Sequence, residues 1–174
     1  MKDRAYAKIN LCLDVASKRE DGYHELKMIM VPIDFYDVLE MNVATTTSLT
    51  LNRSYLPVND KNTIIKAIDV MREHFGFEEN FACRLQKHIP TRAGLAGGSA
   101  DAAAAIRLIM RLLKLHADKD ELIEIAKKVG ADVPFCLINA SIIFVQSGWI
   151  GSLASQSSNA SLVETPFLGL TNKI

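Results

Sequence analysis

The stretch PTRAGLAGGSADAAAA, Pro90–Ala105, decides the fold prediction for this chain of 174 residues. It follows a segment of alternating apolar residues, places three glycines in a short turn, and continues directly into an alanine-rich run. Glycines let a backbone approach a ligand closely and let successive N–H groups point the same way. A following helix adds its free N–H groups and its positive end. The stretch therefore predicts a strand, an anion-binding turn and a helix, and a nucleotide phosphate is the anion that we expect there.

Two well-known phosphate-binding patterns do not describe this turn. It contains neither the Gly-Lys-Ser/Thr of a P-loop nor the GxGxxG of a dinucleotide-binding unit. An ordinary tight turn, capped by Ser99 and followed by alanines that allow close helix packing, would explain the same residues. Ser99 therefore either caps the helix or contacts a phosphate or a metal ion, and this stretch alone leaves these interpretations open.

Outward from the turn, apolar periodicity predicts alternating strands and helices. Strict alternation over Ala5–Val15 predicts a strand whose odd positions face a core, while Tyr6, Lys8 and Asn10 share the other face. Further strands are predicted at 23–33, 39–44, 48–52, 81–89 and 134–145, with an Asp-Gly turn at 18–22. Helices are predicted at 62–75, 99–115 and 119–130.

Capping residues support these helices. Asn62 is expected to cap the first helix and Gly76 to end it, while Asp118 and Glu121 form a capping box for the third. The order of elements predicts an α+β fold of two layers, a mixed sheet and helices. We expect one nucleotide-binding domain over residues 1–146 and a Ser-rich, atypical tail over 147–174.

Charge and cysteine content exclude several classes of protein. The chain carries 20 basic and 20 acidic side chains, which argues against nucleic acid or an acidic membrane held by bulk electrostatics. Residues 133–163 carry no charge, but polar residues interrupt them every few positions, so we expect no membrane span. Three scattered cysteines without a CxxC pair predict reduced thiols and no metal site. The charged N-terminal residues predict no signal peptide, hence a cytoplasmic protein.

Lys8 and Asp132 are the candidate acid–base pair. Asp132 opens an uncharged, apolar stretch, where an aspartate needs a partner or a purpose. A turn aspartate and a solvated lysine are the simpler interpretations. If the two side chains meet, the carboxylate can take a proton from a hydroxyl while the ammonium favours the charged form of both groups. Beside a phosphate site, the reaction would be phosphoryl transfer to an alcohol.

Tyr23 and His24 follow the predicted Asp-Gly turn. Such a pair can form half-buried packing. It can equally stack on a flat ligand, such as a nucleobase, and form hydrogen bonds with it.

Three segments, taken in order and at their separations, resemble one known family. They are AKINLCLDVASKREDGYHEL (Ala7–Leu26), PTRAGLAGGSADAAAA (Pro90–Ala105) and GADVPF (Gly130–Phe135). Together they resemble the 4-diphosphocytidyl-2-C-methyl-D-erythritol kinases of the GHMP kinase superfamily, from about Ala5 to Leu137. The glycine turn is typical of the superfamily, whereas AKINL with DGYHEL distinguishes this family from mevalonate and homoserine kinases.

This resemblance implies ATP-dependent phosphorylation of the 2-hydroxyl of the methylerythritol moiety, in the non-mevalonate route to isoprenoid precursors in the bacterial cytoplasm. It implies that Asp132 is the base and that Lys8 polarises the hydroxyl and holds Asp132 ionised. Asn10 would contact the methylerythritol part, and Tyr23 and His24 would hold the cytosine. The substrate would be a small molecule, cytidyl diphosphate methylerythritol.

The resemblance also implies where ATP would bind. The turn would wrap the ATP phosphates, with Mg²⁺ brought in mostly by the nucleotide. Its expected ATP-binding residues are Pro90, Thr91, Arg92, Ala93, Gly94, Leu95, Ala96, Gly97, Gly98, Ser99 and Ala100. Asn62 and Lys87 would lie near the adenosine end.

The chain departs from the family pattern after Leu137. Tyr6 replaces a usual proline, and Asn139-Ala140 and a Ser-rich stretch replace a Gly-Gly strand and a Gly-rich turn. We therefore expect a truncated or frame-shifted chain without the second domain, which closes over the substrate. Exposed apolar surface would then favour a homodimer. Two functions remain open: a kinase, or a catalytically inactive remnant that at most binds nucleotide.

Overall fold

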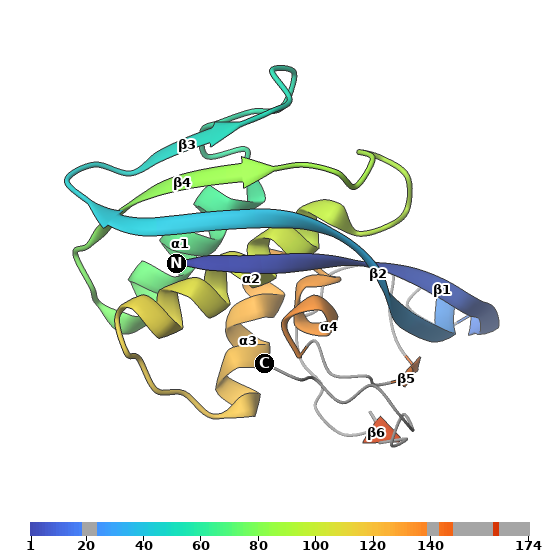
Figure 1. The fold of residues 1–174 in the computed structure, drawn as a ribbon. Helices are drawn as coiled ribbons and strands as arrows, with labels where there is room; N and C mark the ends of the chain where they lie inside the picture. Colours follow the sequence, from blue (N-terminus) through green and yellow to red (C-terminus); the bar gives the residue numbers. More distant parts are fainter. Residues whose placement is uncertain (19–23, 139–142, 148–161, 164–174) are drawn as a thin grey trace, which may run out of the picture. The chain divides into compact units, whose positions relative to one another are not determined.

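The computed structural model describes residues 1–18, 24–138, 143–147 and 162–163, with side chains described at 1–11 and 30–138 (Figure 1). The chain divides into two compact units. The first comprises Met1–Lys8 and Ile33–Ile138, and the second comprises Ile9–Pro32 and Asn139–Ile174. Two long strands, β1 (Lys2–Lys18) and β2 (His24–Ala44), pair with each other and contribute to both units.

In the first unit, strands β3 (Ser48–Leu51) and β4 (Asn80–Gln86) extend the sheet from β2. Strand β4 is antiparallel to β2, with Leu39 opposite Leu85, and parallel to β3, with Leu51 opposite Leu85. The sheet is therefore mixed, as predicted.

Burial alternates along β4 and the residues that follow it. The odd positions are buried: Phe81, Cys83, Leu85, Lys87 and Ile89. The even positions between them are exposed. One face of the sheet therefore meets the core, as the alternation in sequence predicts.

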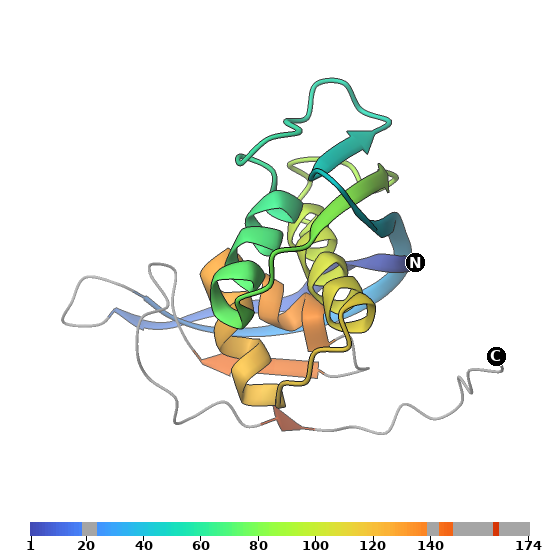
Figure 2. The ribbon, with the colours of Figure 1, turned by 90° about the vertical axis from the view of Figure 1, so that its left-hand side faces the viewer.

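Four helices complete the first unit: α1 (Thr63–Phe75), α2 (Gly97–Leu112), α3 (Lys119–Val129) and α4 (Val133–Ile138). Helices α1 and α4 each contact both α2 and α3. The helices lie on one face of the strands of this unit (Figures 1 and 2). This arrangement confirms the predicted two-layer α+β fold.

Local signals set the helix ends. The Asn62 side chain accepts a hydrogen bond from the backbone N–H of Ile64 at 3.0 Å, and Gly76 ends α1 with a φ of 70°. The Asp118 carboxylate accepts a hydrogen bond from the N–H of Glu121 at 2.8 Å and so caps α3. Both predicted caps are confirmed.

Two predictions of secondary structure are wrong. The ranges 23–33 and 39–44 were predicted as separate strands, but β2 is continuous from His24 to Ala44. The strand predicted at 134–145 begins instead as helix α4, and strand β5 (Ile143–Ser147) follows. A short apolar run fits a buried strand and a buried helix equally, and Pro134, in the first turn of α4, favours the helix.

In the second unit, β5 is antiparallel to β2, with Met30 opposite Phe144, and β6 (Leu162–Val163) is antiparallel to β5. The predicted Asp-Gly turn at 18–22 lies largely outside the described residues. The predicted domain boundary after residue 146 stays a prediction. Among the helices of the described residues, none has the length and apolar character needed to cross a membrane.

Candidate active site

The glycine-rich loop has left-handed backbone at every second residue. The φ angles of Arg92, Gly94 and Ala96 are 60°, 73° and 56°. Such alternation turns neighbouring N–H groups into a concave nest that binds anions. Left-handed backbone costs of order 1–3 kcal/mol at a residue other than glycine, and such strain is typical of functional loops. Within the described residues, this loop holds two of the three non-glycine residues with positive φ.

Helix α2 begins directly after this loop. Its N-cap residue is Ala96, which has no side-chain hydrogen bond to offer, and the first helical bond joins the N–H of Ala100 to the Ala96 carbonyl at 2.9 Å. The N–H groups of Gly97, Gly98 and Ser99 are therefore left for a ligand at the positive end of the helix. Ser99 lies in the first turn, so the interpretation of Ser99 as the cap is wrong. Contact of Ser99 with a phosphate or a metal ion stays a prediction.

Neighbouring elements fix the loop in place. The backbone N–H of Lys8 in β1 donates to the Leu95 carbonyl at 3.1 Å. The Thr63 hydroxyl at the start of α1 donates to the Gly98 carbonyl at 2.7 Å. Residues 90–94 remain exposed between these anchors. The loop is therefore held from two sides and open on the third.

Gly97 is required by close packing. A Cβ atom at this position would lie 2.9 Å from Cγ2 of Ile89 and 3.1 Å from Nζ of Lys87. At Gly98, the nearest atom to an added Cβ would be the Thr63 hydroxyl oxygen at 3.6 Å, which is an ordinary contact. The first residue of α2 thus lies directly over the Lys87 ammonium.

Lys8 and Asp132, the predicted catalytic pair, meet beside the loop. Nζ of Lys8 lies 3.9 Å from Oδ2 of Asp132. The Lys8 side chain is 7% exposed, which excludes a solvated lysine, whereas the Asp132 side chain is 42% exposed. The distance is that of an ion pair and is too long for a hydrogen bond. The carboxylate therefore keeps an accessible oxygen near a buried positive charge.

The other predicted substrate residues are not gathered in the first unit. Asn10 is exposed on β1 in the second unit. Tyr23 and the side chain of His24 lie outside the described residues. Asn62 caps α1 and also donates its Nδ2 proton to the Pro57 carbonyl at 2.8 Å. The ligand contacts of these residues stay predictions.

The structure reveals a charged group that we call the Lys87 cluster: Lys87, Asp37 and Asp101. The sequence reasoning named only Lys87, for the adenosine end of ATP, and missed its two partners. The Lys87 ammonium donates to Oδ2 of Asp37 and, at 2.7 Å, to Oδ2 of Asp101. The three residues are 3%, 0% and 4% exposed, respectively. Oδ1 of Asp37 also accepts the backbone N–H groups of His88 at 2.5 Å and Ile89 at 2.8 Å.

Two sequence signals could have found this cluster. Lys87 falls in the buried phase of the alternation that runs from Phe81 to Ile89. Asp101 interrupts a run of alanines, Ala100 and Ala102–Ala105, that is buried along its whole length. A charge among residues destined for the core needs a charged partner. The same reasoning was applied to Asp132 but not to these two residues.

Burial shifts the acid–base properties of this cluster. Burial raises the pKa of Asp101 to about 7, and the Asp37 carboxyl adds to this rise while Lys87 opposes it. Burial also disfavours the charge on Lys87, but the two carboxyls outweigh burial and raise the pKa of Lys87. Burial alone raises the pKa of the Cys83 thiol to about 12, and burial is the main cause of a similar rise at Cys136.

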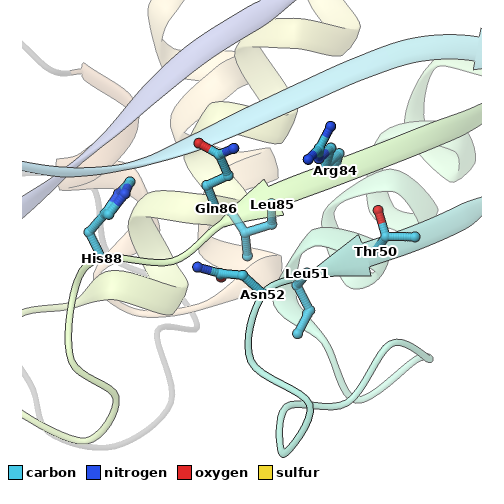
Figure 3. A pocket seen from close by; sticks show the side chains of 7 residues that line it. All are labelled: Thr50, Leu51, Asn52, Arg84, Leu85, Gln86 and His88. Atoms are coloured by element: carbon cyan, nitrogen blue, oxygen red, sulfur yellow. The ribbon is translucent and has the colours of Figure 1, made fainter.

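A pocket lies over β3 and β4 and reaches His88, two residues before the glycine loop (Figure 3). Its lining residues are Thr50, Leu51, Asn52, Arg84, Leu85, Gln86 and His88. Several of its polar groups are already engaged: the Asn52 amide bonds the N–H and the carbonyl of Lys87, and a ring nitrogen of His88 lies 3.1 Å from the Tyr36 carbonyl. Within the described part of the chain, no three His, Cys, Asp or Glu side chains gather as a metal site.

Comparison with known proteins agrees with this geometry. Residues 62–140 match the GHMP kinases N terminal domain family. The 4-diphosphocytidyl-2-C-methyl-D-erythritol kinase of Thermoanaerobacter pseudethanolicus is 50% identical over 137 residues, which are 79% of this chain and 47% of that protein. The kinase of the same name from Clostridium acetobutylicum is 38% identical over 176 residues, covering 100% of this chain and 63% of the relative.

A solved structure gives the same result. The crystal structure of a 4-(cytidine 5'-diphospho)-2C-methyl-D-erythritol kinase matches with a TM-score of 0.70 and 34% identity, over 82% of this chain and 51% of that one. The chain spans about half the length of several curated relatives that it matches. The resemblance inferred from the three sequence segments is confirmed. Residues 62–140 are similar to the GHMP kinases N terminal domain, and the chain as a whole is similar to the 4-diphosphocytidyl-2-C-methyl-D-erythritol kinases.

Proposed function

We propose that this chain is an ATP-dependent kinase that phosphorylates the 2-hydroxyl of 4-diphosphocytidyl-2-C-methyl-D-erythritol, in the non-mevalonate isoprenoid pathway. One observation carries the proposal: the Lys8–Asp132 ion pair lies beside an exposed glycine loop, and the Lys8 backbone is bonded to that loop. The names and identities of the relatives support the substrate.

Asp132 and Lys8 can perform the transfer between them. The Asp132 carboxylate takes the proton of the 2-hydroxyl while the hydroxyl oxygen bonds to the γ-phosphorus of ATP. The bond from that phosphorus to the bridging oxygen breaks, and ADP leaves with the bridging oxygen. The Lys8 ammonium, 3.9 Å from Asp132, offsets the negative charge that develops on the attacking oxygen.

Residues 90–100 are proposed to hold the ATP phosphates through backbone N–H groups of the loop and of the first turn of α2. Mg²⁺ would arrive with the nucleotide and neutralise charge on its phosphates. Asn10 is proposed to contact the methylerythritol moiety, and Tyr23 and His24 to hold the cytosine. A cytoplasmic location and a homodimer formed through exposed apolar surface are further parts of the proposal.

The test is ADP release from ATP and Mg²⁺ in the presence of the cytidyl substrate. We expect Asp132→Asn to lower kcat by about 100-fold or more, because the amide cannot accept the hydroxyl proton. Asp69→Asn is the matched control, since Asp69 is an exposed aspartate on α1, and its kcat should equal that of the unchanged chain.

Two results would contradict the kinase proposal. Equal turnover by the Asp132→Asn variant would remove Asp132 as the base. ATP binding without turnover in the unchanged chain would favour the second candidate, a chain that binds nucleotide without catalysing the transfer.

A further inference from the structure

The Lys87 cluster joins the two stems of the glycine loop. Lys87, His88 and Ile89 lead into the loop, and their backbone and side chain are held by Asp37 of β2. Asp101 lies in α2, which leads out of the loop, and it accepts from the same Lys87 ammonium. The buried Lys87 cluster therefore lies directly beneath the proposed phosphate site and supports it.

The formal charges of the Lys87 cluster do not balance. Lys87 supplies one positive charge, and Asp37 and Asp101 supply two carboxyls, all at most 5% exposed as side chains. Asp101 also interacts with the Cys136 thiol of α4, which is neutral because burial raises its pKa to about 12. A net negative charge sealed beneath an anion site would repel phosphate, and weak solvent screening would strengthen the repulsion.

Hydrogen bonding identifies the carboxyl that can become neutral. Asp37 accepts three donors, the Lys87 ammonium and the N–H groups of His88 and Ile89, so both of its carboxyl oxygens are hydrogen-bonded. Asp101 accepts from Lys87 alone among these, and its Oδ1 is buried without a hydrogen-bond partner. An unpaired buried carboxylate oxygen is costly when charged.

We propose that Asp101 takes up a proton when nucleotide phosphate binds in the glycine loop, so that the Lys87 cluster becomes neutral beneath the bound anion. The inference rests on the proposed function only in taking the loop as the phosphate site. The chemistry is one proton moving from solvent to a carboxylate oxygen of Asp101. Burial already raises the pKa of Asp101 to about 7. The negative charge of a phosphate bound above the cluster raises this pKa further, so that Asp101 is protonated at neutral pH in the complex.

The direction of the pH effect follows from this linkage. At a pH below the pKa that Asp101 has in the nucleotide-free protein, the proton is already present, and phosphate binds without proton uptake. Above it, binding must bring the proton along, so affinity falls as pH rises, by up to tenfold per pH unit. The fall ends above the raised pKa of the complex. A rise of about one pKa unit on binding corresponds to an affinity difference of about tenfold between the two limits.

The experiment is calorimetric titration of the full chain with ATP and excess Mg²⁺, which keeps the terminal phosphate ionised throughout. Titrations near pH 7.5 in two buffers of different ionisation enthalpy count the protons taken up, and a series between about pH 6 and pH 8.5 measures the affinity. We expect uptake of a substantial fraction of one proton and an affinity that falls about tenfold across the series.

The Asp101→Asn variant tests whether Asp101, and not another titratable group, takes up the proton. The amide keeps an oxygen for Lys87 and cannot titrate, so proton uptake and the fall of affinity should both disappear. Asp69→Asn, the exposed control on α1, should retain both. If Asp101→Asn does not fold, carbon-detected NMR of the aspartate carboxyls in the unchanged chain, with and without ATP, should show one buried carboxyl whose pKa rises on binding.

The outcomes are distinct. Binding of ATP with no proton uptake and constant affinity would overturn the role of Asp101 and leave the phosphate site standing. Undiminished uptake in Asp101→Asn would overturn it as well. Absence of ATP binding at every pH would instead overturn the loop as the phosphate site, and the inference with it.

Discussion

Two lysines of the first unit each pair with carboxylates, and their surroundings are opposite. Lys8 lies 3.9 Å from Asp132, whose side chain is 42% exposed. Lys87 bonds two carboxyls at hydrogen-bond distance, and none of these side chains is more than 5% exposed. Both lysines are buried, so burial of the lysine does not distinguish the two sites. The exposure of the acid does.

This difference in exposure distinguishes a carboxylate that can reach a substrate from carboxyls that can only stabilise the fold. A base must reach a substrate hydroxyl, and a half-exposed carboxylate with one distant cation keeps an oxygen available. The carboxyls of the Lys87 cluster are closed to substrate. Asp37 instead holds the backbone that leads into the glycine loop, and Asp101 ties the Lys87 side chain to α2, which follows the loop. Under the proposed function, the same pair of residue types would serve catalysis where the carboxylate faces solvent and structural support where it is buried.

The largest effect on stability is expected at the closed site. Lys87→Met leaves Asp37 and Asp101 facing each other in the core without a cation. We expect the free energy of unfolding, measured by urea titration and circular dichroism, to fall by about 3–5 kcal/mol.

Lys127→Met is the matched control for this change, because Lys127 pairs with Glu124 on the surface of α3 and its loss should cost less than about 1 kcal/mol. Similar losses in the two variants would contradict the distinction between closed and open ion pairs.

A smaller effect is expected where α2 meets the Lys87 cluster. Gly97→Ala would place a methyl group 2.9 Å from Ile89 and 3.1 Å from the Lys87 ammonium, which should lower the free energy of unfolding by about 1–3 kcal/mol. Gly98→Ala meets only an ordinary contact with Thr63 and should leave stability unchanged or raise it by up to about 1 kcal/mol. Thermal unfolding of both variants side by side provides the measurement, and equal losses would show that the space over Lys87 is not what requires Gly97.

The smallest effect on stability is expected at the open pair. Lys8→Met preserves the buried stem, and the Asp132 carboxylate that it leaves behind remains largely solvated, so the loss should stay below about 1 kcal/mol. The same variant should lose most of its kinase turnover in the ADP-release assay. A large loss of stability here would mean that Lys8 supports the fold in the way that Lys87 does.

Much of the fold was predictable because its signals are local. The Asn62 and Asp118 caps, the Gly76 stop and the alternation along β4 each depend on a few neighbouring residues. Helix α4 was not predictable in this way, since residues 133–138 are uniformly apolar and show no period. Packing against α2 and α3 accompanies the helical form, and such packing is not visible in a short window of sequence.

For the candidate site, the proximity of Lys8 and Asp132 beside the glycine loop could be predicted, whereas other features could not. The glycine loop and Asp132 stand out in sequence, and Lys8 could be named because it shares a motif with its neighbours. The start of α2 could not be placed, because the left-handed backbone at Ala96 moves the first turn to Gly97, ahead of Ser99. The partner of Lys87 was also hidden, since Asp37 lies 50 positions away in the chain.

The two buried thiols have a consequence for reactivity. Cys83 lies in β4 and Cys136 in α4, and with a pKa of about 12 each is almost free of thiolate at neutral pH. An alkylating reagent therefore meets a protected and protonated sulfur while either element is closed. Each cysteine is modified only as fast as its own element opens. The modification rate of Cys83 therefore reports local opening of the sheet, and that of Cys136 reports local opening of the helix that follows Asp132.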